Sequence, residues 1–229
     1  MEDFVSKLRQ KFLENANAAN AAQMKAYMRN QYDFFGIKAP AQLQIRQEFL
    51  KAGGLPEISY LPKLIRELWE QPEREFQHFA LALFEKYNKK TDAGFIEILE
   101  MIIVTKSWWD TVDFIAANLV GTHFKRFPEL IPFYTENWMN SGNFWLQRSA
   151  LLFQLKYKKQ TDLPLLFGFI ERLSDSHEFF IRKAIGWTLR EYSKTDPDAV
   201  IRFVNSHQLQ PLSQKEALKV INRKKLTSA

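Results

Sequence analysis

Apolar residues recur at spacings of three and four along most of this chain, and sustained alternation of apolar and polar residues is missing. Phe4, Leu8 and Phe12 form one such stripe, and similar stripes run through residues 61–68 and 76–87. Spacings of three and four place side chains on one face of an α-helix, whereas alternation is typical of a strand. The pattern therefore predicts an all-α protein.

Short segments rich in polar residues, glycine or proline separate these stripes, as helix ends require. They lie at residues 36–40, 53–56, 71–72, 141–143 and 196–197. The helices between them are expected to have about ten to seventeen residues, an ordinary length in globular proteins. Ser213 followed by Glu216 has the spacing of a capping box, so we expect Ser213 to cap the last helix. No linker is long enough to divide the chain, and the expected organisation is a single domain over residues 1–229.

Weak internal similarity indicates helical repeats. Residues 144–157 (FWLQRSALLFQLKY) align without gaps with residues 179–192 (FFIRKAIGWTLREY), which we expect to be matching helices. Two periods upstream of residue 144, the segment 74–87 ends in the similar sequence FEKY. This spacing is typical of stacked helix pairs of the HEAT or armadillo kind. We therefore expect an α-solenoid, a curved superhelix of HEAT-like or ARM-like repeats with a concave face.

Composition excludes several classes of chemistry. The chain has 229 residues, of which 46% are hydrophobic, so it can bury a sizeable core without disulfides or metals. Cysteine is absent, which excludes thiolate metal sites and cysteine nucleophiles and favours a reducing compartment. The N-terminal sequence lacks a signal-peptide pattern, and no apolar run has membrane-spanning length, so we expect a cytoplasmic protein. Glycine-rich phosphate loops and paired metal-ligating histidines are also missing, so neither a cofactor nor a metal is expected.

The formal net charge of +6 favours polyanionic partners without identifying one. Basic residues gather late in the chain, at residues 156–159, at Arg182, Lys183 and Arg190, and at residues 223–225. They would suit one positive surface. The alternative interpretation is a set of ordinary solvated helix faces.

The most informative segment is TKSWWDTVD, residues 105–113, which opens a predicted helix with Ser107 as its N-cap. Trp108 belongs to the inward stripe of this helix. Trp109 and Asp113 are four residues apart and therefore share another face, which places an indole beside a carboxylate. The alternative is that Trp109 is a packing aromatic and Asp113 a solvated charge.

The repeat register extends this face, because Asp113, Arg148 and Lys183 are spaced at equal intervals of 35 residues. Equivalent positions of neighbouring repeats should face the same way, so we expect the three charges to lie along one surface. Trp187 and Arg190 follow Lys183 on the same helix face. Trp187 packed under a neighbouring loop or helix is the alternative.

A carboxylate between two indoles and several cations suits a purine alkylated at N3 or N7, because such a base already carries positive charge and leaves without an acid. An aspartate can stabilise the oxocarbenium-like sugar and help to position water. Indole faces attract the cationic base and sugar, and arginine and lysine hold phosphates. A bifunctional lyase would need an activated lysine, and no lysine lies in a distinctly apolar setting, which favours a monofunctional enzyme.

Several stretches resemble the bacterial AlkD family of DNA alkylation-repair glycosylases, and the resemblance extends over nearly the whole chain. They are residues 66–76 (RELWEQPEREF), 104–113 (VTKSWWDTVD), 145–148 (WLQR), 153–157 (FQLKY) and 183–192 (KAIGWTLREY), with Tyr27 in an Ala-Tyr-Met segment of the expected kind. The resemblance implies a HEAT-like superhelix that holds duplex DNA in its concave face. It also implies a DNA glycosylase of base excision repair that releases bases such as 3-methyladenine and 7-methylguanine.

The resemblance further implies roles for individual residues. Catalysis would centre on Asp113, with Trp109 and Trp187 flanking the deoxyribose of the lesion. The DNA backbone would be held by basic and aromatic side chains, namely Arg148, Tyr27, Lys156 and Arg190, and the repeat register adds Lys183. Lys38 departs from the family pattern, where a neutral polar side chain is expected. We expect the protein to act as a monomer on double-stranded DNA.

Two other functions fit parts of the sequence. A noncatalytic binder of branched or distorted DNA would use the same basic face, but it would not need Asp113, whose charge repels phosphate. A protein-interaction scaffold is a common use of helical repeats, and it predicts a groove of mixed charge. Tyr27, Lys156 and Arg190 could each be ordinary surface or packing residues.

Overall fold

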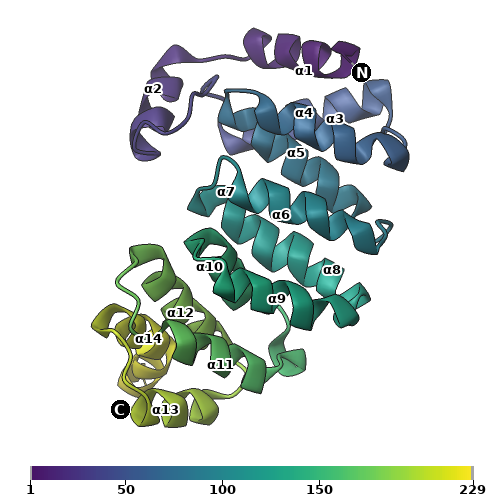
Figure 1. The fold of residues 1–229 in the computed structure, drawn as a ribbon. Coiled ribbons are helices and arrows are strands. Elements are labelled where there is room, and N and C mark those ends of the chain that lie inside the picture. Colours follow the sequence, from purple (N-terminus) through teal and green to yellow (C-terminus); the bar gives the residue numbers. More distant parts are fainter. Residues whose placement is uncertain (1, 228–229) are drawn as a thin grey trace. The chain divides into compact units, whose positions relative to one another are not determined.

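The computed structural model of the chain describes residues 2–227, and every regular element in that range is a helix. The prediction of an all-α protein is therefore confirmed (Figure 1). The chain divides into two compact units, an N-terminal unit over residues 1–98 and a C-terminal unit over residues 99–229. A single domain in the form of a curved solenoid stays a prediction.

The N-terminal unit packs its helices around aromatic side chains. Phe12 is buried against Phe35 and Phe76, with ring centroids 5.5 and 5.1 Å apart. The stripes predicted around residues 4–12, 61–68 and 76–87 supply many of its buried side chains. Its elements are α1 (Glu2–Glu14), α2 (Ala18–Tyr27), α3 (Ala39–Gly53), the 3-10 helix η1 (Ile58–Tyr60), α4 (Leu61–Glu70), α5 (Arg74–Tyr87) and the 3-10 helix η2 (Ala93–Phe95), and α6 (Ile96–Val104) contains the boundary between the units.

A fully buried carboxylate fixes the loop that leads into α3. Glu75 of α5 accepts hydrogen bonds from the backbone N–H groups of Phe35, Gly36 and Ile37 at 3.1, 3.0 and 3.1 Å. Buried backbone donors require such partners. Gly36 has a φ of +85°, and a Cβ there would lie 2.0 Å from the carbonyl oxygen of Asn17, so only glycine fits.

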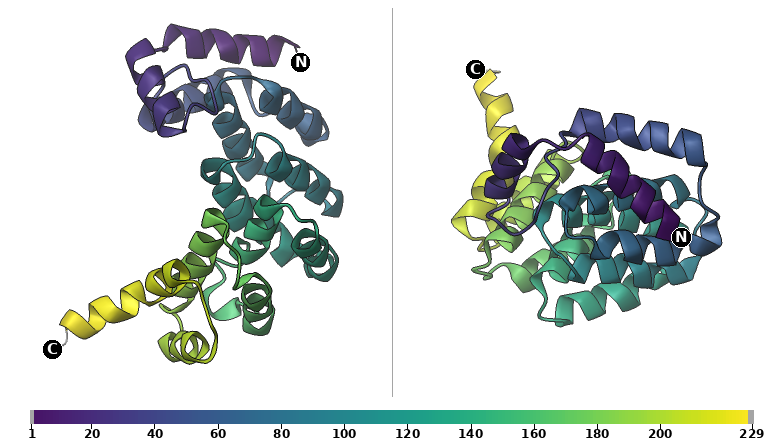
Figure 2. Two further views of the ribbon diagram at one scale, coloured as in Figure 1. Left: turned by 60° about the vertical axis from the view of Figure 1, so that its left-hand side comes forward. Right: turned by 90° about the horizontal axis from the view of Figure 1, so that it is seen from above.

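The C-terminal unit contains one long helical segment and a series of shorter helices. The long segment consists of α7 (Trp109–Phe114), the π-helix η3 (Ile115–Val120) and α8 (Gly121–Arg126), which follow one another without a break. The other elements are the 3-10 helix η4 (Pro128–Leu130), α9 (Ile131–Asn140), α10 (Phe144–Leu152), the 3-10 helix η5 (Lys158–Gln160), α11 (Leu163–Leu173), α12 (Phe179–Tyr192), α13 (Pro197–Ser206) and α14 (Pro211–Thr227). The first turns of α14 pack against α12, and its far end extends away from the unit (Figure 2).

The three segments aligned in the sequence begin helices in the same register. α5 begins at Arg74, α10 at Phe144 and α12 at Phe179, which are separated by 70 and 35 residues. The two aligned segments differ at their C-terminal ends, because α10 ends at Leu152 whereas α12 continues to Tyr192. Beyond Leu152, backbone bonds of the tighter i to i+3 type form, such as Leu155 N–H to the carbonyl of Leu152.

Two predicted caps are wrong. The Ser107 hydroxyl donates to the carbonyl of Ile103 at 2.6 Å, and Trp108 is the N-cap of α7. The last helix begins at Pro211, two residues before Ser213, whose hydroxyl donates to the carbonyl of Arg182 at 3.0 Å. Both hydroxyls thus donate to carbonyls of other turns or helices.

Candidate functional site

Trp109 and Asp113 lie on one face of α7, as their spacing predicts. α7 begins after Trp108, whose extended backbone (φ −155°, ψ 161°) turns the chain into the helix. Val112, Ile115 and Leu119 on the inward stripe are fully buried, and Trp109 and Asp113 are partly exposed. The carboxylate therefore stands at the edge of the core, one helical turn from an indole.

Asp113 is held by an arginine that comes from the equivalent position of the next aligned helix. Arg148 of α10 donates from Nε to Oδ1 of Asp113 at 2.7 Å and from Nη2 to Oδ2 at 2.8 Å. Its Nη1 donates to the backbone carbonyl of Phe180 in α12. The Arg148 side chain is 4% exposed and that of Asp113 is 17% exposed. This paired geometry fixes the orientation of both groups.

The surroundings of Asp113 act on its pKa in opposite directions. Burial raises the pKa of the Asp113 carboxyl above its ordinary value, and the charge of Asp110 adds to this effect. The hydrogen bonds and the positive charge of Arg148 lower the pKa and so favour the ionised form. Burial has the larger effect, so the pKa of Asp113 lies above its ordinary value, and Arg148 limits the rise.

An aromatic cluster lies beside the ion pair of Asp113 and Arg148. The Trp108 ring lies 6.0 Å from the ring of Trp145 and 5.3 Å from that of Phe180, and the Trp145 and Phe180 rings are 4.8 Å apart. The guanidinium carbon of Arg148 lies 5.9 Å from the centroid of Phe180. These contacts join α7, α10 and α12, so the helices that carry Asp113, Arg148 and Trp187 share one packed core.

The π-helix η3, which begins two residues after Asp113, is hydrogen-bonded to the segment that follows α10. The Asn118 side chain donates to the carbonyl of Phe114 at 2.9 Å and accepts a hydrogen bond from the ammonium of Lys156. The Tyr157 hydroxyl donates to the carbonyl of Gly121 at 2.7 Å, and burial raises the pKa of Tyr157. π-helical turns are rare and often lie at functional sites. Lys156 itself is exposed, as a DNA-binding role requires.

On α12, Lys183, Trp187 and Arg190 share the face opposite the buried Ile181, Ile185 and Leu189, as their spacing predicts, and all three are partly exposed. Lys183 has its carboxylate partner on another helix. Its ammonium lies 3.0 Å from Oε1 of Glu216 in α14, and Nη1 of Arg190 lies 2.6 Å from Oε2 of the same carboxylate.

Glu216 was not predicted from the sequence to pair with these cations. The hydrogen bond from Lys183, together with the charges of Lys183, Arg190 and Lys219, lowers the pKa of the Glu216 carboxyl, and burial opposes them. Glu216 lies in the second turn of α14, which packs against α12, and its spacing from nearby residues did not indicate this distant pairing.

Tyr27, the remaining candidate, is the last residue of α2 in the N-terminal unit. Its side chain is 72% exposed. Tyr27 is therefore largely open to solvent.

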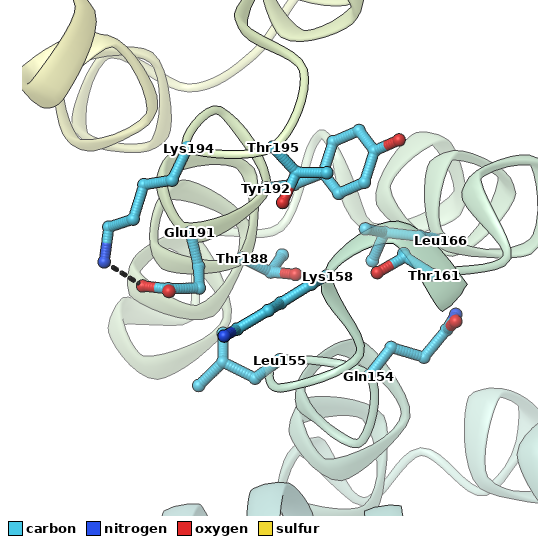
Figure 3. A pocket seen from close by; sticks show the side chains of 10 residues that line it. All are labelled: Gln154, Leu155, Lys158, Thr161, Leu166, Thr188, Glu191, Tyr192, Lys194 and Thr195. Atoms are coloured by element: carbon cyan, nitrogen blue, oxygen red, sulfur yellow. Dashed lines mark hydrogen bonds and ion pairs between the residues drawn. The ribbon is translucent and has the colours of Figure 1, made fainter. Parts of the chain in front are cut away.

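A pocket of about 410 Å³ lies beyond the C-terminal ends of α10 and α12 (Figure 3). Its lining is mostly polar, and Glu191 and Lys194 form an ion pair at its rim. None of the predicted catalytic residues lines it. The candidate site is therefore the helix face that carries Trp109 and Asp113, and not this cavity.

Within the described part of the chain, no group of three or more histidine, aspartate, glutamate or cysteine side chains is arranged to hold a metal ion. No helix among the described residues is long and apolar enough to cross a membrane.

The fold and the site define an all-helical protein that presents an indole and an arginine-bound carboxylate on one helix. The chain matches the family model of the DNA alkylation repair enzymes over residues 8–221 and belongs to that family. It is similar to a solved structure described as a predicted DNA alkylation repair enzyme from Enterococcus faecalis, with 33% sequence identity and a TM-score of 0.83. The similarity covers 90% of this chain and 96% of that one. No curated protein matches the chain. The protein is thus a member of a family of DNA-repair enzymes, as the resemblance in its sequence indicates.

Proposed function

We propose that this protein is a monofunctional DNA glycosylase of base excision repair. It hydrolyses the N-glycosidic bond of cationic purines alkylated at N3 or N7, such as 3-methyladenine and 7-methylguanine, in duplex DNA. The observation that carries the proposal is the orientation of the Asp113 carboxylate. Asp113 lies on the same helix as Trp109, and Arg148 holds its carboxylate through two hydrogen bonds. Family membership supports a role in DNA repair.

The chemistry requires little from the protein besides electrostatics. The alkylated base carries a positive charge and leaves without a proton donor, while positive charge develops on the deoxyribose. A preoriented carboxylate stabilises this oxocarbenium-like sugar and positions the attacking water. The indoles of Trp109 and Trp187 attract the cationic sugar and base through their ring faces. Asp113 therefore acts in its ionised form.

The remaining predicted residues serve DNA binding. Lys156, Lys183 and Arg190 are partly or fully exposed cations of the C-terminal unit, and Tyr27 is an exposed aromatic of the N-terminal unit. Lysine and arginine that contact phosphates position the duplex without reading its sequence. We propose that the three cations contact phosphates near the lesion and that Tyr27 supplies a DNA contact from the N-terminal unit. No cofactor or metal takes part in this scheme, and the protein acts as a monomer.

The proposal is tested by the release of 7-methylguanine from a defined duplex under single-turnover conditions. Asp113→Asn removes the charge and keeps an oxygen that accepts from Arg148. Loss of one electrostatic stabiliser of a transition state typically lowers the rate about 100- to 1,000-fold. Asp110→Asn is the matched control, because it removes one negative charge from the same helix, and it should retain activity.

Both variants are checked for binding to undamaged duplex DNA. Release by the wild-type protein with a large loss in Asp113→Asn supports a glycosylase that uses Asp113. A folded, DNA-binding wild-type protein that releases no base contradicts the enzymatic proposal and favours a noncatalytic DNA binder.

A further inference from the structure

Helix α14 places a single carboxylate over the middle of the α12 face that carries Trp187. Glu216 bridges Lys183 at 3.0 Å and Arg190 at 2.6 Å, and these two cations lie seven residues apart along α12. Seven residues correspond to about two helical turns. Trp187 lies between them, four residues after Lys183 and three before Arg190. The single Glu216 carboxylate therefore pairs with the cations on both sides of Trp187.

The close approach of the two helices depends on a glycine. A Cβ at Gly186 would lie 2.5 Å from the Cβ of Glu216 and 2.9 Å from the carbonyl oxygen of Ser213. Side chains do not tolerate such contacts, so only glycine permits α14 to sit here. Ser213 fixes the same turn through its hydrogen bond to the carbonyl of Arg182. The Glu216 carboxylate is thus built into the interface between α12 and α14.

The Glu216 carboxylate is well placed to remain ionised and to compete for these cations. Its side chain is 15% exposed, while those of Lys183 and Arg190 are 37% and 25% exposed. The cations are therefore reachable from solvent although the carboxylate is mostly covered. Their charges also lower the pKa of Glu216. A phosphate that approaches Lys183 or Arg190 meets a site that already holds an anion.

We propose that Glu216 is a positioning residue that holds Lys183 and Arg190 on either side of Trp187 and competes with DNA phosphates for them. This inference rests on the proposed function, in which the α12 face binds DNA. The carboxylate keeps both cations extended along the face and offsets one of their two charges. It thereby limits the affinity for undamaged DNA while keeping the face ordered for a lesion.

The test compares the wild-type protein with Glu216→Gln, which keeps the size of the side chain and loses its charge. Binding to an undamaged duplex is measured by fluorescence anisotropy over a range of salt concentrations. The variant should bind more tightly at low salt. The slope of log K against log[salt] should become more negative by about 0.9 for each cation that newly contacts a phosphate.

Glu136→Gln is the matched control. Glu136 forms an exposed ion pair with Arg172 at 2.7 Å, so this substitution also raises the net charge by one and frees one arginine. It should change the slope by much less than Glu216→Gln. Glu216→Asp, which keeps the charge on a shorter side chain, should keep the wild-type slope and provides a second test if the glutamine variant does not fold.

The outcomes separate the inference from the proposed function. A wild-type protein that does not bind duplex DNA overturns both. DNA binding by the wild-type protein with equal slopes in Glu216→Gln and Glu136→Gln overturns the inference alone and leaves the glycosylase proposal standing. If Glu216→Gln does not fold, Glu216→Asp decides. A salt slope for Glu216→Asp that is steeper than the wild-type slope by the amount expected for a neutral residue also refutes competition by the Glu216 charge.

Discussion

Replacing Arg148 by methionine tests how the ionised state of Asp113 is maintained. The substitution keeps a long side chain in the aromatic cluster and removes the donors to Asp113 and to the carbonyl of Phe180. The Arg148 side chain is only 4% exposed, so water cannot fully replace its guanidinium. Asp113 would remain as a mostly buried carboxylate without its counter-ion.

The expected effect on stability follows from this burial. Removing one partner of a buried ion pair costs about 3–5 kcal/mol because the other charge stays uncompensated. At about 2–4 °C per kcal/mol for a chain of this size, Tm should fall by roughly 6–20 °C. Thermal unfolding followed by circular dichroism measures this change. Arg172→Met, which removes an exposed arginine paired with Glu136, should lower Tm by much less.

The expected effect on activity concerns the pH dependence of the rate. Burial already raises the pKa of Asp113, and Arg148 opposes that rise. Without Arg148 the pKa rises further, so the acid limb of the single-turnover profile should move to higher pH. The rate at a pH below the new pKa should fall about tenfold for each unit of difference and should recover as the pH is raised.

A different result would refute this reasoning. If Arg148 instead binds a phosphate, Arg148→Met should leave the acid limb in place. The salt dependence of DNA binding should then become shallower by about 0.9. Base release is measured with 7-methylguanine duplex at saturating protein, so that a change in affinity does not enter the rate.

Three further predictions concern buried and partly buried groups, two at the interface of α12 and α14 and one in the N-terminal unit. The folded-state pKa of Glu216 is lowered from 4.5, so its ion pairs stabilise the protein above that pH and lose this contribution as the pH falls through the folded-state value; urea unfolding should separate the wild-type protein from Glu216→Gln more at neutral pH than in acid. Gly186→Ala should destabilise the protein by about 1–3 kcal/mol through overpacking against Glu216, measured as a lower urea midpoint. Glu75→Gln should lower Tm, because it replaces a charged acceptor of three backbone donors, each such bond contributing about 1.5–3 kcal/mol; an unchanged Tm would show that the amide serves equally well.

Most of the fold could be predicted from local sequence. The stripes of apolar residues are the buried faces of helices. The three similar segments, which begin at residues 74, 144 and 179, each begin where a helix begins. Helix ends were less predictable. Ser107 and Ser213 have the residue type of N-caps, but each hydroxyl donates to a carbonyl instead. A serine can serve either purpose, and tertiary contacts decide between them.

The candidate site was predictable as far as helix periodicity extends. Spacing places Trp109 with Asp113 and Lys183 with Trp187 and Arg190, and the structure keeps both groupings. Glu216 was missed because its partners lie 26 and 33 residues away on another helix. The spacing of Glu216 from Ser213 was explained locally as a capping box, so the sequence offered no reason to expect a partner for Glu216 on a distant helix.

The position of Arg148 bears on how the repeat register should be interpreted. Equivalent positions of neighbouring helices were expected to line one surface, and for Asp113 and Arg148 this adjacency becomes direct contact. Arg148 directs one N–H each from Nε, Nη1 and Nη2 to Asp113 and Phe180, which uses three of its five donors. A phosphate that withdrew this guanidinium would leave a buried carboxylate unpaired at the moment when the proposed chemistry needs it ionised. The two roles therefore oppose each other, and the pH profile of Arg148→Met is the measurement that distinguishes them.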